Sequence, residues 1–178
     1  MQASPVHVLL EQLLLEQKSV IGSDFDGYRN HCHRMVSFCL ALRHCSDEEQ
    51  ERIAIAACFH DIGLWTAKTL DYIAPSVLPA MAYLQSHHAE HWAEEVALMI
   101  SEHHKLRAYA DTRYPLVEVF RRADLVDFSL GLFTFGLPRA YIRQVKQRYP
   151  NAGFHRGLIR MALAWFVRHP LNPVPMMK

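Results

Sequence analysis

A histidine and an aspartate stand next to each other at the end of a strongly apolar segment. They are His60 and Asp61, within the run from Cys58 to Gly63. Burying such groups is unfavourable unless a partner pairs or coordinates them, and both are good ligands for a metal ion. Taken alone, a His-Asp pair is more often structural. Its interpretation therefore depends on whether other segments supply further ligands.

Two predicted helices carry such side chains on their apolar faces. In the first, at about residues 26–44, His31 shares a face with large apolar residues, whereas His33 falls on the polar side and is expected to be solvated. In the second, which begins at Pro115, Asp124 lies in a row of core residues. These helices are the elements that must bring the ligands to the His-Asp pair.

His31, His60, Asp61 and Asp124 make a set of two imidazoles and two carboxylates. Such a set suits a divalent ion such as Mn, Fe, Co, Ni or Zn and leaves coordination positions for water. For any one residue the alternative is structural: a hydrogen-bonded core histidine, a helix-end cap or the partner of a nearby arginine. For all four, these roles would have to coincide independently. We therefore expect a metal site between the central helices, with one ion favoured and two as the alternative.

The hydrophobic periodicity predicts an all-α fold, a bundle of about seven to eight helices. Helix starts are indicated by Ser4-Pro5, by a capping box from Ser46 to Glu49 and by Pro115. Gly63 fits a helix stop. The run from Leu130 to Leu137 fits either a short strand or a tight turn. Further helices are expected at about residues 75–88, 90–104, 138–149 and 154–169.

Length and composition predict one domain over residues 1–178, with the metal-site core at about 26–127 and C-terminal helices and a tail at 138–178. Nineteen basic and eighteen acidic residues give a net charge of +1, so neither a nucleic-acid polymer nor a membrane is expected as a partner. No apolar run reaches the ~18 residues of a spanning helix, and a cytoplasmic protein is expected.

The apolar tail from Pro170 to Lys178 is expected to cover its own core or a partner, such as the second copy of a homodimer. The four cysteines lack Cys-x-x-Cys spacing and are expected to be reduced core residues.

The order and spacing of the four ligands resemble the HD-domain superfamily of metal-dependent phosphohydrolases. That pattern is a His, an adjacent His-Asp pair and a distant Asp, here His31 in HCHRMV, His60-Asp61 in AACFHDIG and Asp124 in RRADLVD. Arg34 follows His31 as in the family's His-x-x-Arg form. The resemblance covers about residues 26–127. It implies an HD-type helical bundle and the hydrolysis of a phosphomonoester, a nucleotide or a cyclic nucleotide.

The double histidine His103-His104 is similar to one found in bimetallic branches of that superfamily. Those branches carry a further histidine upstream, for which His87, His88 and His91 are the candidates here. The separation from His88 to His103 is short against those branches, and an exposed polar junction is the favoured interpretation of these three residues. A second metal site would use His88, His103 and His104.

We expect the bound metal to activate a water that attacks phosphorus, with Asp61 as ligand and proton acceptor. Arg34, Lys105 and Arg107 are the candidates to bind the phosphoryl group of a small phosphorylated substrate. His103 or His104 would protonate the leaving oxygen if it is not a ligand. Two other functions are considered: a di-iron oxygenase on an HD-like scaffold, and a non-catalytic nucleotide sensor.

Overall fold

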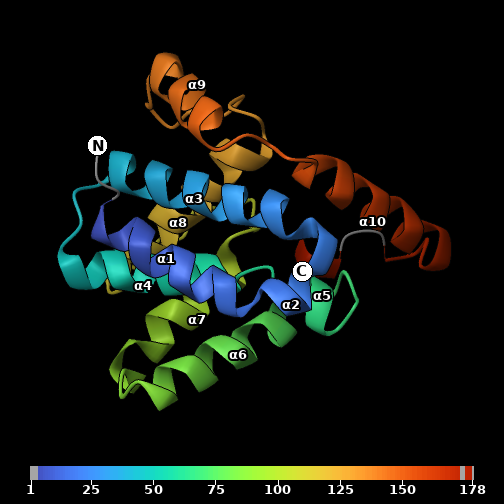
Figure 1. Ribbon diagram of the computed structural model, residues 1–178, viewed down its shortest axis with the longest axis horizontal. Helices are drawn as coiled ribbons and strands as arrows, with labels where there is room; N and C mark the ends of the chain where they lie inside the picture. Colours follow the sequence, from blue (N-terminus) through green and yellow to red (C-terminus); the bar gives the residue numbers. More distant parts are fainter. Residues whose placement is uncertain (1–3, 173–174, 178) are drawn as a thin grey trace.

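The computed structural model describes residues 4–172 and 175–177. Over these residues the chain is all-α, without a strand, and eight of its helices have ten residues or more (Figure 1). The longer helices are α1 (Pro5–Glu16), α3 (Phe25–Leu42), α4 (Asp47–Phe59), α6 (Ile73–Ser86), α7 (Ala93–Glu102), α8 (Pro115–Phe128), α9 (Arg139–Arg148) and α10 (Phe154–Arg168). The short ones are α2 (Lys18–Ile21) and α5 (Gly63–Thr66), with 3-10 turns at Gly22–Asp24, Glu90–Trp92 and Pro175–Met177. The predicted helical fold is confirmed.

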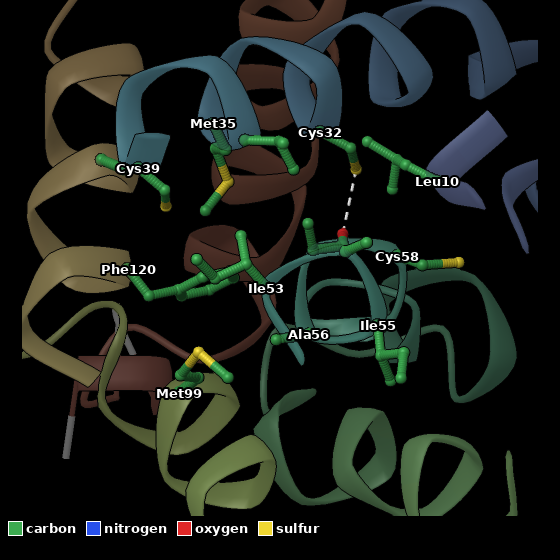
Figure 2. Close-up of a cluster of buried hydrophobic side chains, with 14 of the residues drawn as sticks. Leu10, Cys32, Met35, Cys39, Ile53, Ile55, Ala56, Cys58, Met99 and Phe120 are labelled. Carbon is green, nitrogen blue, oxygen red and sulfur yellow. Dashed lines mark hydrogen bonds between the residues drawn. The ribbon is translucent and has the colours of Figure 1, made fainter. Parts of the chain in front are cut away.

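Four helices form the centre of the bundle. Helix α3 packs along α8 and α4, α7 packs against both α4 and α8, and α1 covers α3 and α4. Figure 2 shows the core between them, where Met35 of α3 lies above Ile53 of α4, with Phe120 of α8 and Met99 of α7 completing the layer. All four cysteines are buried and free, as expected, and the Cys32 thiol donates to the carbonyl of Ala57 at 3.0 Å.

The helix starts follow the sequence signals. Ser46 accepts from the amide of Glu49, and the Glu49 carboxylate accepts from the amide of Ser46, so the predicted capping box is confirmed. Pro5 and Pro115 stand in the first turns of α1 and α8. The expected helix at 90–104 is divided into a 3-10 turn and α7.

Three local expectations are corrected or decided. Gly63 does not stop a helix: it opens α5, and a Cβ there would lie 2.3 Å from the carbonyl oxygen of Tyr72. Close backbone approach is thus the reason for this glycine. The run from Leu130 to Leu137 is a series of turns. His33 is 3% exposed, so its predicted solvation is wrong, because α1 covers that side of α3.

The C-terminal part lies against α3. Helices α9 and α10 occupy the top and right of the view in Figure 1, away from α6 and α7. The inner face of α10 packs on the loop that ends in Tyr72, and Met176 joins that contact. Of the predicted tail, Pro175 is buried and Met176 packs on the chain's own core, whereas Leu171 is 99% exposed; residues 173, 174 and 178 lie outside the described residues. Among the described helices, none combines the length and apolar character needed to cross a membrane.

Candidate metal centre

His60 and Asp61 occupy the turn that follows α4, where the chain leaves the core. The Nδ1 atom of His60 lies 2.9 Å from the carbonyl oxygen of Ala57. A carbonyl can only accept, so this nitrogen carries the proton and Nε2 holds a lone pair. Tyr28 fixes the same turn: its hydroxyl donates to the carbonyl of Cys58 at 2.9 Å and accepts from the amide of Asp61 at 3.3 Å.

His31 reaches the same point from α3. Its Nδ1 lies 2.7 Å from Oδ2 of Asp127, and Asp127 is held on its other side by Arg34 through bonds of 2.6 and 2.8 Å. Burial alone would raise the pKa of Asp127, but the hydrogen bonds from His31 and Arg34 outweigh it and hold that pKa well below its usual range. An ionised carboxylate only accepts, so Nδ1 of His31 is also protonated and its Nε2 is bare.

His103 repeats the arrangement at the end of α7. Its Nδ1 lies 2.6 Å from the carbonyl oxygen of Ile100, which leaves Nε2 as the lone-pair nitrogen. Three buried imidazoles from three segments therefore have their protonated nitrogens bound to outer partners. Such partners are the usual means by which proteins orient metal-binding histidines.

The bare nitrogens point at one another. Nε2 of His31 lies 3.1 Å from Nε2 of His60, although neither nitrogen has a proton to share when both rings are neutral. Burial lowers the pKa of His31 to about 4, despite the opposing effect of Asp127, so the His31 ring is uncharged near neutral pH. Two facing lone pairs repel, and a cation placed beside both removes the repulsion.

Asp61 connects two groups of possible ligands. Its Oδ2 lies 3.2 Å from Nε2 of His60, and its Oδ1 lies 3.4 Å from Nε2 of His103. Oδ1 of Asp61 and Nε2 of His103 are both buried without a hydrogen-bond partner. Buried acceptors of this kind are rare and fit coordination to a metal ion. Within the described part of the chain, two groups of side chains could hold an ion: His31, His60 and Asp61 form one, and Asp61, His103 and His104 form the other.

Asp124 closes the ring of acceptors from α8. Its Oδ1 lies 3.6 Å from Nε2 of His31, and its Oδ2 lies 3.5 Å from Nδ1 of His104. Burial raises the pKa of Asp124 to about 8, and the charges of Asp61 and Asp127 act in the same direction. A nearby cation would favour the ionised carboxylate.

His104 forms the outer edge of the centre. Its side chain is 18% exposed, whereas those of Asp61 and Asp124 are 4% and 5% exposed. Nε2 of His104 is hydrogen-bonded to the hydroxyl of Tyr72. Burial raises the pKa of Tyr72 well above its usual range, as do the charges of Asp61 and Asp124, so the phenol keeps its proton. His104 is the most exposed of the candidate ligands in this centre.

The structure brings together His31, His60, Asp61, Asp124, His103 and His104, and separates them from His88. His88 is exposed beyond the end of α6, together with His87 and His91, as the favoured interpretation of these three predicted. Lys105 is half-buried and Arg107 exposed just beyond His104, and both stay predictions as substrate-binding cations.

Arg34 does not have the position expected of a substrate-binding cation. It is 1% exposed, and besides Asp127 it donates to the carbonyls of Tyr149 and Pro150 at 2.9 and 3.2 Å. These N–H groups of Arg34 are thus hydrogen-bonded within the fold. Arg34 orients Asp127, and Asp127 in turn orients His31. Glu118, by contrast, pairs with Arg121 and Arg122, each at 2.7 Å.

Three residues of the centre escaped sequence reasoning: Tyr28, Tyr72 and Asp127. Only Asp127 left a signal, since it lies one turn after Asp124 in the same core row. Comparison with known proteins adds nothing to this assignment: no family model, no curated protein and no solved structure matches the chain.

Proposed function

We propose that this chain is a metal-dependent phosphohydrolase of the HD type. The observation that carries the proposal is the convergence of three unprotonated imidazole nitrogens and two carboxylates, with an orphaned acceptor on Asp61 and another on His103. A buried acceptor without a donor is suited to coordinate a cation. The order of the ligands along the chain supports the HD type, because His31, His60-Asp61 and Asp124 follow that pattern.

Two ions are the arrangement that the contacts favour. Asp61 directs one carboxylate oxygen towards His60 and the other towards His103, so it would contribute to both groups of ligands. His31 and His60 would hold the first ion with Asp61, and His103 and His104 the second. Bound ions of this kind supply a water of lowered pKa and positive charge for a phosphoryl oxygen.

The surrounding residues would bind and orient the substrate. His104 stands at the accessible edge, and Lys105 and Arg107 follow it, so a phosphoester entering there meets cations before it meets the buried carboxylates. For His104 to hold an ion through Nδ1, its Nε2 would carry the proton and donate to the Tyr72 hydroxyl, which would hold this ring at the edge of the centre. Arg34 has no role in substrate binding in this proposal.

The test measures metal content and phosphoesterase activity together. Asp61→Ala should lose all metal while keeping the helical circular dichroism, and His104→Ala should lose part of it. His88→Ala is the matched control, because it removes an exposed histidine outside the centre. The wild type should hydrolyse p-nitrophenyl phosphate or a nucleotide only with metal bound. Full metal retention in Asp61→Ala would contradict the site, and a metal-loaded protein inert towards a broad phosphoester panel would contradict the activity.

A di-iron oxygenase is the second candidate, and one observation favours it. His103 and His104 join the first ligands through Asp61, which gives the larger histidine set that such chemistry requires. Iron-loaded protein would then show a visible absorption band that changes on exposure to oxygen. A non-catalytic sensor would instead be stabilised by nucleotide without turning it over.

A further inference from the structure

The charge of the chain is divided unevenly along its length. Asp127 is the last acidic residue, and the 51 residues after it contain eight lysines and arginines. The first 127 residues carry eighteen acidic and eleven basic side chains. The net charge of +1 therefore conceals a C-terminal segment of +8 and a preceding body of −7. Such asymmetry is typical of chains that bind an anionic surface.

Helix α10 presents apolar side chains on two faces. Its inner face packs on the loop that ends in Tyr72. Its outer face forms a second apolar stripe, in which the spacing of four, three and one residues places the side chains along one side of the helix. The stripe consists of Ile159, Leu163, Phe166 and Val167, which are 61%, 62%, 50% and 81% exposed. These residues add nothing to the core, and together they form an exposed apolar surface on a helix at the edge of the fold (Figure 1).

Cations flank this stripe. Arg156, Arg160 and Arg168 are exposed on α10, and the side chain of Arg160 is 75% exposed, with Asp24 as a distant partner at 3.9 Å. Neither α9 nor α10 contains an acidic residue. Helix α9 contains four more cations. The apolar stripe is therefore flanked by cations, with Asp24 as the acidic side chain that lies beside them.

We propose that the outer face of α10 binds the surface of an anionic phospholipid bilayer. The apolar stripe would enter the boundary between headgroups and acyl chains, while the arginines bind lipid phosphates and carboxylates. With 15 residues, α10 is shorter than the ~20 needed to span a bilayer, so it would lie in the plane of the membrane. The expectation that the chain has no membrane partner is revised by this proposal.

Other occupants fit the same surface less well. In a symmetric dimer through α10, the two copies would bring the same arginines together with no acid on either copy of α10 to neutralise them. Nucleic acid would place phosphates against Leu163 and Val167 at the middle of the face. The hollow beside α10 includes Ile159 and Leu163 but not Phe166 or Val167, so a peptide bound there would leave half of the stripe uncovered, whereas a flat bilayer would cover all of it.

The test is vesicle co-sedimentation of the full chain. Vesicles of phosphatidylcholine with phosphatidylserine are compared with vesicles of phosphatidylcholine alone. The double variant Leu163→Ser/Val167→Ser should weaken binding to the anionic vesicles more than about tenfold. Arg156→Gln should weaken it about fivefold. The control is Leu78→Ser, which removes a leucine that is 71% exposed on α6, on the other side of the molecule.

The expected result is wild-type binding to the anionic vesicles that falls with added salt, is retained by Leu78→Ser and is lost in the double variant. All variants should keep the wild-type circular dichroism and metal content, since none touches the metal centre. Absence of binding by folded wild-type protein would overturn the proposal, as would equal binding by the double variant. A wild-type dimer that the double variant converts to monomer, without any response to lipid, would assign the stripe to self-association and overturn it too.

Discussion

Nε2 of His31 and Nε2 of His60 lie 3.1 Å apart, while the Nδ1 atom of each ring is engaged by an acceptor. The outer acceptors, Asp127 and the carbonyl of Ala57, decide which nitrogen of each ring carries the proton. The two Nε2 lone pairs therefore face each other because of the contacts that the Nδ1 atoms make on the opposite side of each ring. Contacts within the fold therefore orient both lone pairs towards a position suited to a cation.

Metal binding should therefore stabilise the protein. With a divalent ion at about a hundred times its dissociation constant, linkage adds ~2.7 kcal/mol. For a chain of 178 residues this corresponds to a rise of about 5–10 °C in Tm. Thermal unfolding followed by circular dichroism, with a chelator and after adding Mn²⁺, Fe²⁺ or Zn²⁺, measures the shift. An identical Tm in chelator and in each metal would contradict a metal centre built from these residues.

Replacement of Arg34 by lysine should destabilise the fold by ~3 kcal/mol, because a lysine cannot replace a bidentate pair with Asp127 and two carbonyl contacts in a buried position. Urea unfolding measures the change. Arg122→Lys is the control, since that arginine is exposed and its pair with Glu118 should be worth less than ~1 kcal/mol. If Arg34→Lys had unchanged stability and a raised KM for a phosphoester, Arg34 would instead act as a substrate-binding cation.

Much of the fold follows from local sequence signals. The capping box at Ser46 marks a helix start because it pairs free amides of the first turn. The prolines at positions 5 and 115 mark helix starts because proline has no amide hydrogen that would need a partner there. The ligands His31 and Asp124 were found because a polar group in an apolar row is visible in the periodicity. These inferences need only the residues within a few turns of each other.

The remaining features depend on contacts between distant segments. His33 was assigned to solvent because its side of α3 is polar, yet Glu11 of α1 and Tyr149 beyond α9 cover it. With 13 of its 18 residues buried, α3 has almost no solvent side. Arg34 was assigned to substrate for a similar reason, since its partner Asp127 lies 93 positions away. No local pattern encodes such partners.

Gly63→Ala should destabilise the protein by ~2–3 kcal/mol, because the added Cβ would lie 2.3 Å from the carbonyl of Tyr72 and 2.9 Å from Oγ of Ser76. The shift of Tyr72 should also disturb its bond to His104 and reduce metal content. Gly157→Ala is the matched control: nothing lies within 4 Å of its Cβ, and alanine should stabilise α10 by ~0.5–1 kcal/mol. Equal stabilities of the two variants would contradict the close approach at Gly63.

Acid should weaken the contact between α1 and α3 through His7. Nδ1 of His7 lies 2.9 Å from Nδ1 of His33, whose Nε2 pairs with Glu11 at 2.9 Å. Burial, and then the charge of His33, lower the pKa of His7 from 6.5 to about 4. The folded state therefore binds a proton less readily than the unfolded state, so this stabilisation is complete above pH 6.5 and is lost as the pH falls towards 4.

The change with pH should be measurable by urea unfolding at pH 7 and pH 5. His7 is partly exposed, so the loss attributed to it over the full interval is about 1–2 kcal/mol, less than the shift alone would give. Only part of the His7 contribution is lost between pH 7 and pH 5. In His7→Gln the difference in unfolding free energy between the two pH values should shrink by most of that part, because glutamine does not take up a proton. His44→Gln, which removes an exposed histidine, is the control. If His7→Gln kept the full wild-type difference, the acid sensitivity would belong to other buried histidines such as His31, and the contact between α1 and α3 would not be its source.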